Sequence, residues 1–135
     1  TDSGAKAEDG PLSESKSHPR AWGSFPRILG KYVRDEKLMP IEEAIRRFTS
    51  RPAARVGLTD RGLLRPGLKA DVTVFDAARI RDLSTFTDPT HYSEGVQYVF
   101  VNGQAVVDKG RITDARPGEA LRGPGAKKAN PPASR

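Results

Sequence analysis

The chain has 135 residues, a hydrophobic fraction of 36% and a formal net charge of +6, which fits one domain with a modest core. The absence of cysteine excludes disulfides and a thiolate nucleophile or metal ligand. No apolar run approaches the roughly 20 residues that cross a membrane, and no signal peptide is visible. Aromatic residues make up only 7% and do not alternate with lysine and arginine as base-stacking platforms do. We therefore expect a cytoplasmic protein with neither a nucleic acid nor a membrane as partner.

The first part of the chain is predicted to be a long loop followed by a helix. Residues 1–19 contain two glycines, two prolines and few apolar side chains. A helix is predicted over residues 24–36, because apolar side chains recur at helical spacing, Ser24 is a suitable N-cap and Pro26 suits the first turn. Gly30 lowers the helix propensity by about 1 kcal/mol. Packing must compensate, or a neighbour must approach closely.

Two further helices are predicted in the next stretch. Residues 41–49 carry apolar side chains at i, i+3, i+4 and i+7, with Pro40 before them. Glutamates near the start and arginines near the end suit the helix dipole. Ser50 is a suitable cap for a short third helix, and Gly57 is expected to end it.

Strands are expected in the remainder. β-Branched and apolar residues predict strands at 71–76, 96–101 and 104–108. Asn102-Gly103 between the last two is a strong hairpin signal, because a type I′ turn needs positive φ at both positions. From about residue 117 the composition changes, and we expect a flexible tail over 117–135, with disorder from 126 onward.

Helices followed by strands indicate an α+β fold class. Three short strands have few partners for their own edges, so we expect them to belong to a larger sheet whose other strands lie elsewhere. The first residue is not Met. Together these features favour a chain that is part of a longer protein.

The sequence carries no metal-binding motif of its own. It contains two histidines, His18 and His91, without the spacings that zinc sites use. It also lacks a nucleophile elbow and a phosphate-binding glycine loop. Catalysis by this chain alone is therefore not indicated.

Three polar side chains near the N-terminus are candidates for a site, and each has an ordinary alternative. Asp2 precedes a Ser-Gly pair and is either a turn-forming carboxylate or a general base. Arg20 is either a surface ion-pair partner or a bidentate clamp for a carboxylate. His18 is either an ordinary loop histidine or a residue that orients its neighbours in a site.

Several stretches of the sequence resemble amidohydrolases. Residues 62–76, G-L-L-R-P-G-L-K-A-D-V-T-V-F-D, resemble the segment that many of these enzymes carry after a metal-bearing (β/α)8 barrel, and so do residues 101–103 and 106–107. In that superfamily the strands complete a small β-sandwich. Residues 18–30 are similar to the H-P-R-x-x-G-x-F-P-R-x-L-G run of N-acyl-D-amino-acid deacylases (D-aminoacylases), and residues 41–58 and 86–95 continue the similarity.

The resemblance implies a fold, an activity and roles for the candidate residues. Residues 1–58 would be the end of the barrel, with its catalytic loop and helices, and residues 59–116 strands of the β-sandwich. The intact enzyme would use zinc to hydrolyse N-acyl-D-amino acids. Asp2 would take a proton from the attacking water and return it to the amine, and is also a candidate metal ligand. Arg20 would clamp the substrate carboxylate, with His18 beside it in the substrate site.

The remaining zinc ligands of that family lie on earlier barrel strands and have no counterpart in this chain. The resemblance therefore implies a C-terminal fragment that binds no zinc and is inactive alone, with exposed helix faces available for self-association. Two alternatives stay open. One is a non-catalytic helix/β interaction module, and the other is a different amidohydrolase, either dihydropyrimidinase-like or a deaminase.

Overall fold

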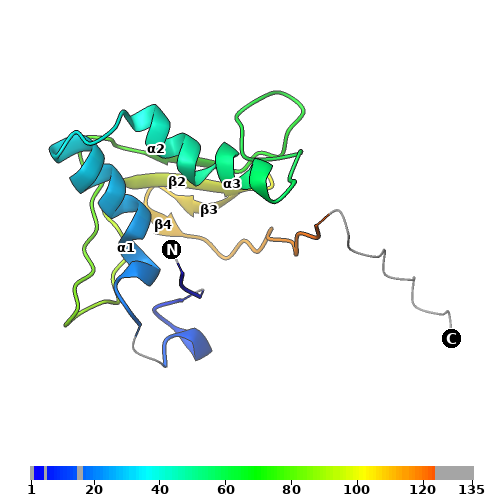
Figure 1. Cartoon of the computed structure of the whole chain (residues 1–135). Coiled ribbons are helices and arrows are strands. Elements are labelled where there is room, and N and C mark those ends of the chain that lie inside the picture. Colours follow the sequence, from blue (N-terminus) through cyan, green and yellow to red (C-terminus); the bar gives the residue numbers. More distant parts are fainter. Residues whose placement is uncertain (1, 5, 15–16, 124–135) are drawn as a thin grey trace, which may run out of the picture.

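The structure, a computed structural model, describes residues 2–4, 6–14 and 17–123, so the disorder predicted from residue 126 onward lies outside it. Helices precede an antiparallel sheet, and α2 and α3 lie across it in Figure 1. This is the predicted α+β order. Within the described residues no helix is long and apolar enough to cross a bilayer. The elements are the 3-10 helix η1 (Gly10–Leu12), α1 (Arg20–Arg27), the π-helical η2 (Ile28–Asp35), α2 (Ile41–Phe48), α3 (Ser50–Arg55), β1 (Val72–Phe75), β2 (Val96–Val101), β3 (Gln104–Asp108) and β4 (Arg111–Ile112).

The first long helix begins earlier than predicted. It starts at Arg20 and continues from α1 into η2, so Ser24 is not its N-cap. Pro19 occupies that position with φ −50°, and its carbonyl accepts the first helical hydrogen bonds. A proline has its φ already fixed near the helical value, which favours a helix start. Ser24 lies inside the helix, where its Oγ donates to the Arg20 carbonyl at 2.8 Å, and Pro26 is also internal.

The predicted second helix is confirmed as α2, and the third is confirmed with a different start. Ser50 is the first residue of α3, and Thr49, at the N-cap position, makes no side-chain capping bond. The predicted end at Gly57 is correct: its φ is +77°, and its N–H donates to the Ala54 carbonyl at 3.2 Å. The N–H of Leu58 donates to the Ala53 carbonyl at 2.9 Å. These two bonds form a Schellman motif, in which a glycine takes the left-handed position.

The sheet is antiparallel throughout, in the order β1-β2-β3-β4. The predicted hairpin turn is confirmed by φ values of +47° at Asn102 and +81° at Gly103. The sequence analysis did not predict β4. It follows a second two-residue turn, in which Lys109 and Gly110 also have positive φ, at +49° and +78°. A lysine in this position is not a recognised turn signal, so only the glycine could have indicated the turn.

The core is built around Ile80, which is only 2% exposed. A Cβ on Gly30 would lie 2.5 Å from the Ile80 carbonyl oxygen, and one on Gly95 would lie 2.6 Å from the Ile80 Cα. The close neighbour predicted for Gly30 is therefore the backbone of Ile80. Apolar side chains from the helices and from β1 and β2 surround this contact, among them Leu29, Val33, Ala44, Phe75 and Val96.

Arg34 satisfies the backbone of the segment that crosses the helix. Its Nη1 donates to the carbonyls of Ile80, Ala78 and Ala77 at 2.8, 3.2 and 3.4 Å. Its Nε donates to Asp35 at 2.7 Å. The bond to the Ile80 carbonyl is partly buried, and a buried carbonyl needs such a donor.

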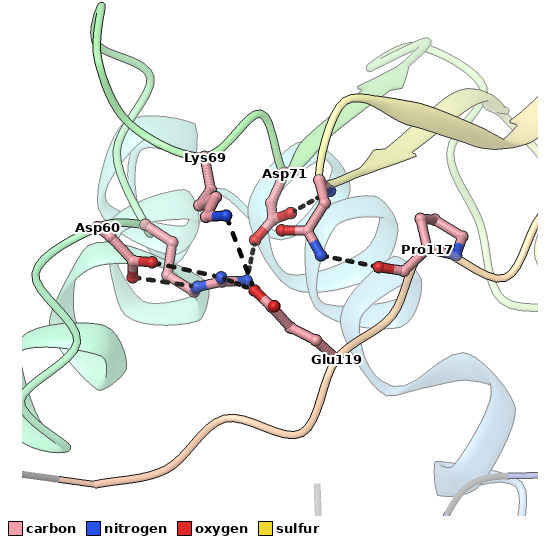
Figure 2. A network of polar contacts seen from close by, with 7 residues as sticks. Asp60, Lys69, Asp71, Pro117 and Glu119 are labelled. Atoms are coloured by element: carbon pink, nitrogen blue, oxygen red, sulfur yellow. Dashed lines mark hydrogen bonds and ion pairs between the residues drawn. The ribbon is translucent and has the colours of Figure 1, made fainter. Parts of the chain in front are cut away.

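A second polar network joins the hairpin turn to the chain beyond the sheet (Figure 2). Arg61, with a side chain only 10% exposed, contacts Asp71 at 2.8 Å and Glu119 at 2.9 Å. The other oxygen of Asp71 accepts the N–H of Asn102 at 2.8 Å, and the Asn102 side chain donates to the Pro117 carbonyl at 2.8 Å. The beginning of the predicted tail is thus bonded to the rest of the chain.

We expect Gly30→Ala to lower the melting temperature. Alanine has the better helix propensity by about 1 kcal/mol, so a net loss must come from the contact with the Ile80 backbone. Overpacking of this kind costs roughly 1–3 kcal/mol. Thermal unfolding followed by circular dichroism tests this. Gly118→Ala is the matched control, because a Cβ there meets no described atom within 4 Å. Equal melting temperatures for the two variants would contradict the prediction.

We expect Glu43→Gln to destabilise the chain in a pH-dependent way. Hydrogen bonds from Arg46 and Arg47 lower the pKa of Glu43 to about 2. A lowered carboxylate pKa contributes stability above the ordinary value of 4.5, and this is lost as the pH falls through about 2. The melting-temperature difference between the native chain and the variant should be small, because the pair is solvent-screened. It should also shrink over that pH range. Glu42→Gln, which changes the same helical turn without an arginine pair in the described chain, should lack this pH dependence.

Candidate functional site

The structure brings the three predicted residues together at the start of α1. Arg20 is the first residue of this helix, and its Nη2 lies 3.6 Å from the Asp2 carboxylate. The Asp2 side chain is 95% exposed and that of Arg20 is 48% exposed. An exposed pair of this kind contributes little stability. The guanidinium of Arg20 is therefore accessible to another carboxylate as well.

His18 is held between the helix start and a distant loop. Its Nδ1 accepts the backbone N–H of Arg20 at 3.1 Å. Its ring lies edge-on to that of Phe86, with centroids 5.1 Å apart. The imidazole thus links the helix that carries Arg20 to the segment after Asp82. The second histidine, His91, pairs with Asp88 at 2.7 Å and does not line the same groove.

A groove of about 400 Å³ runs between these two parts of the chain. The helix contributes one wall and the segment after Asp82 the other. Its lining combines two arginines and a histidine with hydroxyls and one aromatic ring. The residues are His18, Pro19, Arg20, Gly23, Ser24, Arg27, Asp82, Ser84, Thr85 and Phe86.

Asp82 is the buried charge of this groove, with a side chain only 6% exposed. Its carboxylate accepts the N–H of Ser84 at 2.8 Å and lies 3.3 Å from Arg27. The hydrogen bond that Arg27 donates to Asp82 raises the pKa of Arg27 above its usual range. The carboxylate occupies the space that a Cβ on Gly23 would fill. The sequence analysis did not predict a role for Asp82 or Phe86, since only long-range contacts bring them to the groove.

The loop from Ser84 to Tyr92 is packed on the same helix at a second point. The Trp22 and Tyr92 rings meet edge-on with centroids 5.3 Å apart, and the Trp22 Nε1 donates to Ser17 at 2.8 Å. Burial raises the pKa of the Tyr92 hydroxyl, and the nearby carboxylate of Glu8 raises it further. Segments before and after α1 therefore meet at its N-terminal half.

The described residues do not assemble a metal centre. Across 2–4, 6–14 and 17–123 no group of three or more His, Cys, Asp or Glu side chains is placed to hold an ion. Asp2, the candidate ligand, faces Arg20. A catalytic zinc needs about three protein ligands, so these residues do not fit a complete zinc site.

A groove lined by arginines, a histidine and a buried carboxylate beside apolar groups is typical of small-molecule sites. The model of the amidohydrolase family matches residues 4–107, and the chain belongs to this family. The predicted membership is thus confirmed.

Its curated relatives include three enzymes of Alcaligenes xylosoxydans xylosoxydans. They are an N-acyl-D-glutamate deacylase (46% identical), an N-acyl-D-aspartate deacylase (44%) and a D-aminoacylase (43%). Each alignment covers 84% of this chain and 23% of the relative, so the chain spans less than a quarter of their length. A dihydroorotase of Lactobacillus johnsonii is 30% identical over 64% of the chain.

Solved structures agree with these relatives. A D-aminoacylase structure is 46% identical, with a TM-score of 0.71, and the match covers 73% of this chain and 21% of that one. An N-acyl-D-glutamate deacylase of Bordetella bronchiseptica, solved with zinc and a phosphonate inhibitor that mimics the tetrahedral intermediate, is 48% identical with a TM-score of 0.72. That match covers 78% of this chain and 22% of the other.

Proposed function

We propose that this chain supplies part of the active site of an N-acyl-D-amino-acid deacylase, an enzyme that hydrolyses a linear amide to a carboxylate and a D-amino acid. The observation that carries the proposal is the pairing of Asp2 with Arg20, a residue that lines the groove, 3.6 Å apart. It occurs in a chain 43–46% identical to three deacylases.

The short distance between these side chains fits an α-substituted acid. In an N-acyl amino acid, the scissile amide nitrogen and the free carboxylate are attached to the same carbon atom. A proton-transfer group at the nitrogen and a cation at the carboxylate must then be close neighbours. Arg20 would bind the carboxylate through two N–H groups, and Asp2 would lie beside the nitrogen.

Asp2 would act as the general base and then as the general acid. It accepts a proton from the attacking water as the new C–O bond forms, and it donates that proton to the amine as the C–N bond breaks. His18 would keep Arg20 in place by accepting the hydrogen bond from the Arg20 backbone N–H, and would border the substrate. Zinc, when bound, would polarise the amide carbonyl. The described residues do not fit a complete zinc site, so its other ligands must come from outside this chain.

We also propose an assignment of the parts. Residues 1–58 form the end of the barrel, 59–116 strands of the β-sandwich and 117–135 a tail, in a cytoplasmic enzyme. Exposed apolar side chains after α3 support the assignment to a larger fold, including Val56 at 58% exposed and Leu64 at 84%. They line a hollow with Phe48 and Phe75. The missing part of the enzyme would cover this surface, which otherwise favours self-association.

A second candidate is hydrolysis of a cyclic amide, favoured by the similarity to dihydroorotases. It differs from deacylation in the product, since ring opening leaves the acid and the amine in one molecule. An assay that separates these products decides between the two.

The proposal can be tested by measuring the kinetics of a chimaeric deacylase that contains this chain. This chain would replace the matching part of the Alcaligenes D-aminoacylase. In that protein Asp2→Ala should lower kcat about 100-fold or more, because proton transfer contributes roughly 10²–10⁴-fold. Arg20→Ala should act mainly through KM, and Arg20→Lys should restore part of the binding. Arg111→Ala, on the exposed β4 strand, is the control. Near-native kcat in Asp2→Ala would show that the assigned role is wrong.

A further inference from the structure

We propose that Asp82 is a positioning residue that holds Phe86 at the wall of the groove opposite Arg20, where Phe86 contacts the apolar part of the substrate. This rests on the proposed function for the identity of the substrate. The positioning itself rests only on contacts within the described chain.

The buried carboxylate of Asp82 is tied on two sides. It accepts the N–H of Ser84, which fixes the direction of the chain toward Phe86, and it pairs with Arg27 on the helix. A buried charge is costly unless it is paired and hydrogen-bonded. These partners therefore hold the carboxylate in one place, and the segment that follows it cannot move independently of the helix.

Gly23 provides the space for this arrangement. A Cβ at that position would overlap the Asp82 carboxylate, so any other residue would displace it from the helix surface. Gly23 lies one helical turn after Arg20, on the wall of the same groove. The residues that hold Asp82, Gly23 and Arg27, are therefore on the same helix as the Arg20 guanidinium.

Phe86 is the part of this segment that is free to meet a ligand. It is 82% exposed, although its ring lies against His18. An exposed aromatic ring in the same groove as a guanidinium suits a molecule with a carboxylate at one end and an apolar group at the other. Such a ring would favour N-acyl amino acids with apolar side chains over those with a second carboxylate.

The first experiment uses the complete 135-residue chain and NMR. Asp82→Ala removes the carboxylate that contacts the helix, and Gly23→Ala displaces that carboxylate from the helix. Both should abolish the ring contact between His18 and Phe86 and speed hydrogen exchange of the Ser84 amide at least tenfold.

Asp108→Ala, at the exposed end of β3, and Gly118→Ala are the controls. Asp82→Asn, which keeps an acceptor for Ser84 but not the ion pair, should give an intermediate result and serves if the other variants do not fold. An intact His18–Phe86 contact and unchanged Ser84 exchange in these variants would overturn the positioning role.

The second experiment uses the deacylase chimaera. Asp82→Ala should raise KM about tenfold with a smaller change in kcat, because a displaced wall weakens binding without removing a reacting group. Phe86→Ala should lower kcat/KM about tenfold for N-acetyl-D-leucine and much less for N-acetyl-D-glutamate. Equal losses for the two substrates would overturn the role of Phe86. Loss of the Arg20→Ala effect would instead contradict the proposed function, while the NMR result would still stand.

Discussion

The fold depends on a place where two stretches of backbone meet without side chains between them. The segment at Ile80 lies directly against the helix at Gly30, and Gly95 allows the same approach from the side of the sheet. Contacts this close do not tolerate larger residues, because a dense interior has no room for an added methyl group. The Ile80 carbonyl at this contact is partly shielded from water, and Arg34 donates a hydrogen bond to it. Apolar packing and polar satisfaction are thus achieved at one junction.

The same junction connects the core to the candidate site. Two residues beyond Ile80 the chain reaches Asp82, which lies against the helix at Gly23, and the helix begins a turn earlier at Arg20. Phe86 follows on the other wall of the groove. One helix therefore carries the core contact near its end and the groove at its beginning. The geometry of the groove is set by the packing of the core.

Local patterns predicted those elements whose cause is local. The spacing of apolar residues in α2, the turn at Asn102-Gly103 and the glycine after α3 each follow from a few neighbouring residues, and all three are confirmed. The helix start was wrong because Ser24 and Pro26 looked like a cap and a first turn. In the structure Pro19 is the N-cap and Pro26 lies inside the helix.

The candidate site shows the same division. Asp2, His18 and Arg20 were predicted as polar residues of the N-terminal loop that match a family pattern, and the structure pairs Arg20 with both of the others. Asp82 and Phe86 are about 60 residues further on, and nothing in their own surroundings indicates where they fold. Gly30 carried the one usable signal of a long-range contact, since a glycine inside a helical pattern needs a reason.

A main-chain contact also constrains how such a chain can change over time. The helix meets this segment through its main chain, so the exposed side chains at 79 and 81, on either side of the buried Ile80, are not fixed by that contact. Arg79 and Arg81 both contact Glu94 on the outer side. Replacing either arginine by an uncharged residue would alter the surface charge while leaving the distance from the main chain to the helix unchanged. The residues underneath have no such freedom, because Gly30 and Gly95 cannot gain an atom. The surface of this segment can therefore vary between related proteins while its path stays fixed.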